Sequence, residues 1–249
     1  IQQAIDDGNS SGRLVFIPKG TFFISKTLFL KSGTRLTGIG CKRYGPVPIT
    51  NISAHSTWQK TSGNDALIGT VDDPEASTFI SGFNLVTNAN VVRHIHWCAG
   101  RKSMITGIGF YGTVSEAAVY LSGNGGGKHY MLEPQSPSTG SEHRHIRIAG
   151  TFQPLSLYGC NLEADSASAY NMEISDSSNI RIYGIKREKE SPTVLIRNCK
   201  NLAIHTQGAM REGVHTGSGG YIQIKGASDG ILMSLALVQS NNKIVRAHV

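Results

Sequence analysis

The sequence predicts an all-β fold, a right-handed parallel β-helix with an N-terminal capping helix. Three observations predict it: the composition, a repeat of short alternating strands, and polar residues that recur between those strands. The 249 residues include 29 glycines, whereas only 16% are charged and 7% are aromatic. Such a composition is typical of strands and turns, because a helical bundle would carry far more Glu and Lys.

The N-terminal segment, residues 1–12 (IQQAIDDGNSSG), reads as an amphipathic helix followed by a polar loop. A helix in this place can cover the first edge of a sheet, which would otherwise invite pairing with another chain. The next stretch, RLVFIPKGTFFISKTLFLKSGTRLTGIG, gives short strands separated by Gly-Thr turns. We therefore expect a capping helix and then the first turns of the β-helix, which are called rungs below.

The repeat is clearest near the C-terminus, in three segments that begin at Asn171, Thr193 and Tyr221, with offsets of 22 and 28 residues. Each segment has an alternating strand, a polar turn and a second alternating strand. A period of 20–30 residues predicts a solenoid whose rungs pair at about 4.8 Å. Alternation predicts that the following residues point into the shaft: Ile174, Ile180, Ile182, Val194, Ile196, Leu202, Ile204, Ile222 and Ile224. The polar turns predict a column of Asn179, Asn201 and Asp229.

A second repeat concerns outward-facing residues. LYGCNLE, which ends at Glu163, and IYGIKRE, which ends at Glu188, share the frame Tyr-Gly-x-x-x-Glu at an offset of 25 residues. On successive rungs this offset places Tyr158 over Tyr183, and the 22-residue offset adds His205. The same register sets Glu163 over Glu188 and Asn161 over Lys186.

These side chains form a candidate carbohydrate groove, in which aromatic rings hold pyranoses and charged groups bind hydroxyls or transfer protons. Two carboxylates one rung apart would lie near the roughly 5 Å separation of a retaining glycosidase pair, and their repulsion would raise one pKa. The candidate catalytic residues are Lys186, Glu188, Glu163, Tyr183 and His205. The candidate substrate-binding residues are Tyr158, Asn161, Arg187, Arg211, His129 and Tyr130.

A purely structural reading of the same residues stays open. Stacked like residues are common on β-helices simply because the rungs resemble one another. An exposed Tyr then covers the sheet, and Glu188 pairs with Lys186 or Arg187 in solvent.

Residues 122–145 (SGNGGGKHYMLEPQSPSTGSEHRH) read as a long loop insertion rich in Gly, Ser and Pro. Long loops in compact domains are often functional. This one can wall a cleft, with Lys128, His129 and Tyr130 at one end and His143, Arg144 and His145 at the other. The alternative is a loop that is disordered or contacts a partner. GNGGGK lacks the spacing and the following helix of a phosphate-binding loop.

Metal and cofactor signals are weak. His94 and His96 share one face of a strand but have no evident third ligand, and Asp72, Asp73 and Glu75 are the only calcium candidates. We therefore expect no cofactor and no metal centre, with calcium as the one open alternative. Four cysteines, without any CxxC spacing, read as separate buried thiols: Cys41, Cys98, Cys160 and Cys199.

The opening helix and the stretch VFIPKGTFFISKTLFLKSGTRLTGIG resemble the start of the pectate-lyase-like β-helix superfamily. HIHWCAGRKSMITGIGFYG further resembles the first barrel of family 55 glycoside hydrolases. The resemblance covers residues 1–112 and implies the fold, but it says little about the reaction, because the matching segment caps and starts the shaft. Those glucanases carry two barrels and depend on the second for catalysis. No segment here matches their catalytic acid, and the Asp-Pro-His pattern of mannuronan epimerases is absent.

For function we favour an extracellular enzyme that cleaves an acidic polysaccharide by β-elimination. The net charge of +7 and pI of about 9.3 suit a polyanionic substrate, and no block of basic residues indicates nucleic acid or a membrane. Lys186, Arg187 or Arg211 would neutralise the uronate, and Tyr183, His205 or Lys186 would remove the C5 proton. Hydrolysis through Glu163 and Glu188, of the family 55 type, is the first alternative.

The other class of function is non-catalytic: a tailspike-like adhesin, a glycan-binding module or one barrel of a larger assembly. The C-terminal NNKIVRAHV has no obvious closing helix, which predicts that a second barrel or another subunit covers the last rung. The start at Ile1 suggests a trimmed chain, and the sequons at Asn9 and Asn51 are compatible with secretion.

Overall fold

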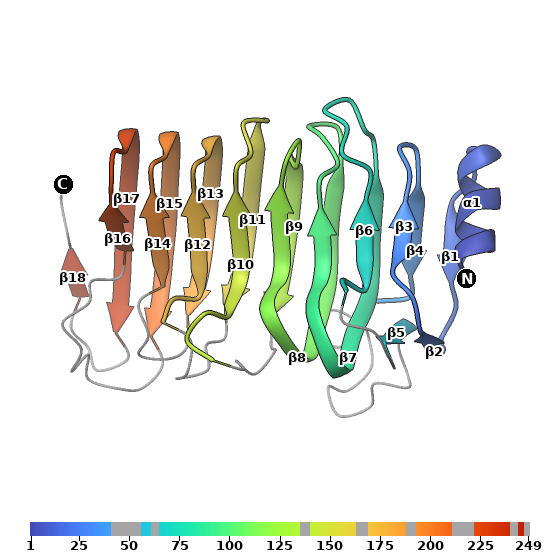
Figure 1. The fold of residues 1–249 in the computed structure, drawn as a ribbon. Helices are drawn as coiled ribbons and strands as arrows, with labels where there is room; N and C mark the ends of the chain where they lie inside the picture. The colour runs from blue at the N-terminus through green and yellow to red at the C-terminus, as the bar shows by residue number, and fades with distance from the viewer. Residues whose placement is uncertain are drawn as a thin grey trace.

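The computed structural model describes residues 1–40, 56–60, 65–134, 140–162, 169–187, 193–210, 222–239 and 244–246. They form an all-β parallel solenoid with a short N-terminal helix, 64% strand and 5% helix. Figure 1 shows the shaft from the side, with α1 at one end and β18 at the other. The predicted fold class, a parallel β-helix with an N-terminal helix, is confirmed.

The elements follow one another as α1 (Gln2–Ser10), β1 (Val15–Ile17), β2 (Gly20–Ile24), β3 (Leu28–Leu30), β4 (Arg35–Gly38), β5 (Ser56–Lys60), β6 (Ile68–Thr70), β7 (Phe79–Trp97), β8 (Met104–Ser122), β9 (Gly127–Pro134), β10 (Arg144–Ala149), β11 (Leu155–Leu162), β12 (Met172–Ser175), β13 (Ser178–Arg187), β14 (Val194–Arg197), β15 (Lys200–Met210), β16 (Ile222–Lys225), β17 (Asp229–Gln239) and β18 (Ile244–Arg246).

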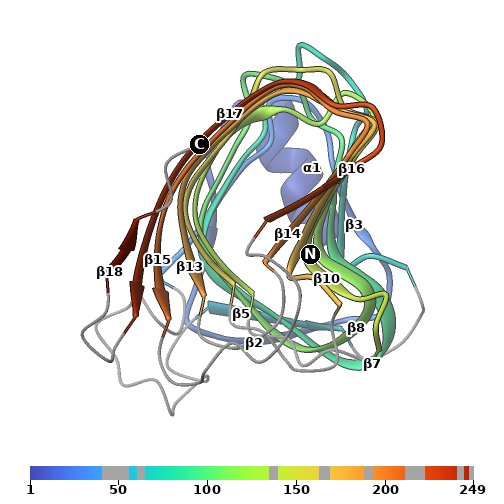
Figure 2. The same cartoon turned by 90° about the vertical axis from the view of Figure 1, so that its left-hand side faces the viewer.

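Two broad faces of the shaft matter for function. The first contains β1, β4, the starts of β7 and β8, and then β9, β11, β13, β15 and β17. The second contains β3, β6, the ends of β7 and β8, and then β10, β12, β14 and β16. Figure 2 looks along the shaft and shows β13 and β15 on one side with β14 and β16 on the other.

The core lies inside the shaft, where residues in equal register stack on one another. Met172 pairs with Val194 and Ile182 with Ile204, as the repeat predicts. The predicted inward residues are buried, except that Ile222 is only partly buried and Ile224 is 44% exposed. Ile224 keeps its register opposite Ile196, but among the described strands β16 pairs only with β14, so one side of Ile224 is uncovered there.

Truncation of Ile182 to alanine is expected to lower the free energy of unfolding by about 2–5 kcal/mol, because the cavity would lie between two rungs that cannot close on it. Ile182 is fully buried and pairs with Leu157 and Ile204. The measurement is equilibrium unfolding in urea. Ile224→Ala is the matched control and should cost much less; equal losses at both positions would contradict the placement of the core.

The helix α1 covers the first edge, as expected. The side chain of Gln2 donates to the carbonyl of Phe29 and accepts from its N–H, each at 2.9 Å, so it mimics a missing strand beside β3. Asn9 donates to the Ser32 carbonyl and to Thr34 Oγ1, each at 3.0 Å. These bonds satisfy backbone and side-chain groups that an open sheet edge would leave for another chain.

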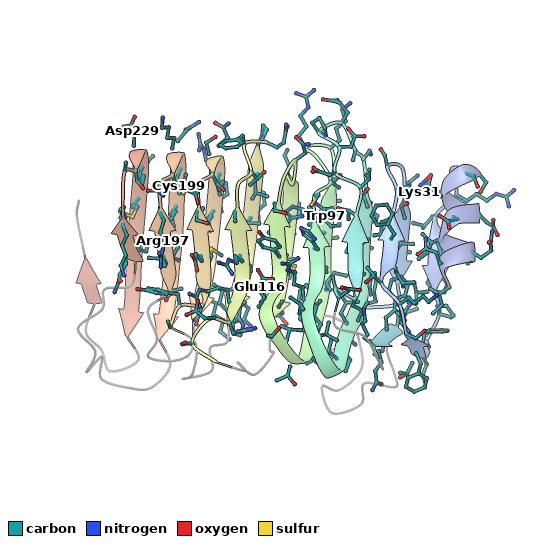
Figure 3. The ribbon with its side chains drawn as sticks, viewed as in Figure 1. Lys31, Trp97, Glu116, Arg197, Cys199 and Asp229 are labelled. Carbon is teal, nitrogen blue, oxygen red and sulfur yellow. The ribbon has the colours of Figure 1, made fainter. Side chains whose placement is uncertain are left out.

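The polar turns form ladders, with one correction. Asn179 and Asn201 both have positive φ (63° and 53°), and Asn201 Nδ2 donates to Asn179 Oδ1 at 2.7 Å. Asp229, labelled in Figure 3, does not continue this column, because it pairs with Lys200. Gly230, with φ of 62°, takes the place after Asn201 in the column. The offset from β15 to β17 is therefore one residue longer than the predicted 28 residues.

The predicted loop at residues 122–145 is wrong in its middle. Residues 127–134 form β9, which pairs in parallel with β8 and β11, and β10 begins at Arg144. The glycines serve close packing: a Cβ on Gly127 would lie 2.1 Å from the Ser103 carbonyl oxygen, and one on Gly125 2.5 Å from that of Trp97. The glycine run therefore marks a rung corner.

Candidate functional site

An aromatic ladder runs along the first face. Tyr130, Tyr158, Tyr183 and His205 stand in equal register on β9, β11, β13 and β15. Successive ring centroids are 4.7, 5.0 and 5.4 Å apart, and the planes differ by only 9°, 11° and 9°. The two offsets in the sequence therefore predicted the stack of Tyr158, Tyr183 and His205 correctly, and the structure extends it to Tyr130.

A left-handed corner follows each tyrosine of the ladder. Gly159 and Gly184 have φ of 62° and 79°, and Met131 takes the same conformation at 53°. The chain bends here from the first face into the next one. This corner explains the Tyr-Gly frame, since glycine adopts positive φ without the cost that other residues carry.

Stacking decides which part of each ring can meet a ligand. In a ladder with spacings near 5 Å, each inner ring has both faces covered by its neighbours, so it presents only its edge and hydroxyl to solvent. Tyr183 is 39% exposed despite this coverage. The expectation that pyranoses lie on the ring faces is therefore wrong for the inner rings, and contacts with a glycan would use hydrogen bonds from the phenols.

Basic side chains flank the ladder on its strand side. Lys128 and Arg181 lie two residues before Tyr130 and Tyr183, and Ser156 stands between them in the same register. Arg181 is held in place, because its guanidinium donates to the carbonyl and the side-chain oxygen of Asn201 at 2.7 and 2.8 Å. Sequence reasoning did not single out Arg181 as a site residue.

Beyond the corner lies a polar column that contains Glu133, Asn161 and Lys186. Each residue comes three positions after a ladder tyrosine, and Asn161 pairs with Lys186 as predicted. Glu133 and Asn161 are buried, and Asn161 Nδ2 donates to Glu133 Oε1 at 3.4 Å. Sequence reasoning missed Glu133; aligning YMLE with YGCN and YGIK would have found it.

Several predicted site residues cannot be placed. Glu163, Glu188 and Arg211 lie outside the described residues, so the predicted pair of carboxylates stays a prediction. Arg187 lies at the end of β13, opposite Leu162.

His129 belongs to the core, which corrects its assignment to the substrate groove. Its side chain is fully buried against Trp97, with ring centroids 5.5 Å apart. Nδ1 accepts from the Ile105 N–H at 3.1 Å, so Nε2 carries the proton and donates to the Gly126 carbonyl at 3.1 Å. Burial lowers the pKa of His129 to about 4, which keeps the ring neutral at pH 7.

The metal candidates have other roles. His94 is buried and bonds the Tyr111 carbonyl, Asp72 accepts from the backbone and side chain of Asn124, and Glu75 pairs with Arg101 and Lys102. Within the described ranges, no group of three or more His, Cys, Asp or Glu is arranged to hold a metal ion. Cys98, Cys160 and Cys199 are free and buried, as expected of separate thiols, and Cys41 lies outside the described residues.

None of the described helices is long and apolar enough to cross a membrane. No protein-family model matches the sequence, and the search of curated proteins gave no match.

Among solved structures, the enzymatically active domain of tailspike protein 2 from bacteriophage CBA120 is similar, with a TM-score of 0.54 and 12% identity. The full-length tailspike protein 2 of this Escherichia coli O157:H7 bacteriophage gives 0.53 and 10%. The similarity covers 92% of this chain in both, but only 39% and 36% of the tailspike chains. At this identity the likeness shows the β-helix fold. It does not confirm the finer resemblance to pectate lyases or family 55 glycoside hydrolases.

Proposed function

We propose that this chain binds an acidic polysaccharide along the aromatic ladder and cleaves it by β-elimination. The observation that carries the proposal is the continuous row of Tyr130, Tyr158, Tyr183 and His205, with Lys128 and Arg181 on one side and Lys186 on the other. A row of hydrogen-bonding edges between cations suits a linear polymer that carries carboxylates and hydroxyls. The net charge of +7 would also attract a polyanion.

The residues support distinct roles in β-elimination. Lys186 would neutralise the uronate carboxylate, which acidifies the proton on C5. Tyr183 or His205 would take that proton; the C5–H electrons form a C4–C5 double bond while the bond from C4 to the glycosidic oxygen breaks. The leaving oxygen then takes up a proton to become a hydroxyl. Elimination therefore cleaves the chain without water or any other co-substrate.

Hydrolysis is the second candidate, and Glu133 favours it. This buried carboxylate lies in the same column as Lys186 and is bonded by Asn161. It would serve as a general acid, with water as the co-substrate and a second carboxylate such as Glu163 or Glu188 as its partner. The tailspike domain with the same fold is described as enzymatically active, which is compatible with either reaction.

One experiment separates these classes of function. The protein is incubated with polygalacturonate, alginate and hyaluronate, while absorbance near 235 nm and new reducing ends are followed together. We expect both signals, because elimination leaves an unsaturated sugar. Reducing ends without absorbance would indicate hydrolysis. Neither signal with retained binding would indicate a glycan-binding module, and absence of binding to any acidic polymer would refute the proposed function.

The Tyr183→Phe variant is expected to bind the polysaccharide about threefold to tenfold more weakly, because it loses one hydrogen bond but keeps its place in the stack. Tyr170→Phe is the matched control: its hydroxyl donates to Gln223 at 2.7 Å on the second face, so the affinity should not change. Titration calorimetry gives both values. An unchanged affinity in Tyr183→Phe would mean that the ladder serves the fold alone.

A further inference from the structure

A separate pocket of about 440 Å³ opens on the second face, across the shaft from the ladder. Its lining comes from β3, β6, the end of β7 and residues beside these strands, and it includes Phe29, Asp65, Ala66, Gly69, Arg93 and His96. Small-molecule sites range from about 300 to 1,000 Å³, so the pocket has the size of a binding site.

The pocket exists because one column of side chains has a gap. Phe29 pairs with Gly69, Gly69 with His96, and His96 with Tyr120. Phe29 and His96 are thus two rungs apart, about 10 Å along the shaft, with no side chain between them. A Cβ on Gly69 would meet Thr27 and Phe29 at 3.5 and 3.7 Å, which is ordinary contact, so the fold itself does not require glycine here.

The ring of His96 is held rigidly at one end of this gap. One face stacks on Tyr120, with centroids 5.1 Å apart. Arg93 Nη1 lies 3.4 Å from Nδ1 and can only donate, so Nε2 carries the proton and donates to Ser122 Oγ at 2.8 Å. Arg93 itself is fixed by Glu116, labelled in Figure 3, and by the Tyr120 ring beneath it.

Polar groups surround the gap between the two rings. Thr70 is buried, and its Oγ1 accepts from the N–H groups of Cys98 and Ala99 at 2.7 and 3.0 Å. These two bonds fix the residues directly after β7 against the end of β6. Asp65 and Arg93 add an acceptor and a donor to the lining. The buried ammonium of Lys60 holds this wall through the Ala66 carbonyl at 2.9 Å.

The nearby thiol does not make this a nucleophilic site. Cys98 Sγ lies 3.4 Å from His96 Nε2, but that nitrogen carries the proton that goes to Ser122. Burial raises the pKa of the Cys98 thiol. Burial and the positive charge of Arg93 lower the pKa of His96. Both groups therefore stay neutral near pH 7. The arrangement suits binding.

We propose that this pocket binds one pyranose residue of a glycan, with its ring between Phe29 and His96. The two aromatic side chains would contact the C–H groups of the sugar, while Asp65 and Arg93 bond its hydroxyls. Aromatic walls with donors and acceptors on the rim match a ring that carries hydroxyls around its edge. The inference stands independently of the function proposed for the ladder.

The test uses the whole chain with ¹³C-labelled histidine and methyl glycosides of glucose, galactose, mannose, N-acetylglucosamine and glucuronic acid as probes. At least one glycoside should shift the NMR signals of the His96 ring in a saturable manner. Gly69→Leu should abolish the shift, because leucine fills the gap without backbone strain. Phe29→Ala should weaken binding on the order of tenfold, since one aromatic wall is lost.

Gly140→Leu is the matched control, because a Cβ there meets nothing within 4 Å, and it should bind like the unmodified protein. Thermal unfolding of each variant shows whether the fold survives. No saturable shift with any of the glycosides would overturn the proposal, as would binding that persists in a folded Gly69→Leu variant. Adenosine serves as a flat-ring probe, and a His96 shift with adenosine alone would equally overturn the assignment to a sugar.

Discussion

The Lys186→Ala variant is expected to cleave an acidic polysaccharide about 10²–10³-fold more slowly, since it loses the charge that neutralises the uronate as the C5 proton leaves. Lys186 lies opposite Asn161, three residues after Tyr183, so its position in the register is known. The rate of absorbance increase near 235 nm at saturating substrate measures the loss. Lys186→Arg keeps the charge and should recover part of the rate.

Lys102→Ala is the control for the loss of one positive charge. Lys102 is exposed and pairs with Glu75 at 2.7 Å, away from the ladder, so its variant should keep the full rate. A Lys186→Ala enzyme with an unchanged rate would rule out the proposed neutralising role. If the unmodified protein instead releases reducing ends without absorbance, and Glu133→Gln abolishes that release, the reaction is hydrolysis.

Acidification from pH 7 to pH 4 is expected to destabilise the fold by several kcal/mol, because buried neutral histidines resist protonation. Burial lowers the pKa values of His94 and His129 to about 4, against 6.5 when exposed. Below pH 6.5 the unfolded chain therefore binds protons that the folded chain does not, and stability rises with pH in this window. Each of the two residues should contribute a loss of about 2 kcal/mol at pH 5 and about 3 kcal/mol at pH 4.

His143 should act in the same direction, since burial and the neighbouring His145 lower its pKa to about 3. Urea unfolding between pH 7.5 and pH 4 measures the effect, and His129→Gln should flatten the pH dependence by the share of one histidine. Glutamine keeps a donor for the Gly126 carbonyl, which limits the cost at neutral pH. A stability that stays constant from pH 7 to pH 5 would contradict neutral, buried histidines.

The repeated frame allowed much of the first face to be predicted from the sequence. Offsets of 25 and 22 residues stacked Tyr158, Tyr183 and His205 correctly, because strict alternation along the paired strands fixes which side chains share a column. Tyr130 and Glu133 were not aligned, since Met131 occupies the corner where the other rungs have glycine. A left-handed methionine is too rare to be inferred from the sequence alone.

Contacts between distant segments set the limit of sequence reasoning. GNGGGK suggested a loop, whereas its glycines admit the backbones of Trp97 and Ser103 at close range. Such packing becomes apparent only when the rung of the glycines is placed against the neighbouring rung that contains Trp97 and Ser103. The pocket on the second face was missed for the same reason, because Phe29, Gly69 and His96 are far apart in sequence and no repeated frame connects them.

Because a left-handed corner follows each ladder tyrosine, each rung adds one aromatic ring and one corner to the ladder. A deletion of the 25 residues from Tyr158 to Ile182 would bring Tyr183 over Tyr130 and shorten the row by one ring, with every corner still in step. A shift of one residue in the pairing between two strands would instead turn the side chains of the shifted strand to its opposite side. The number of rings in the row, and with it the length of the row, therefore changes in whole rungs.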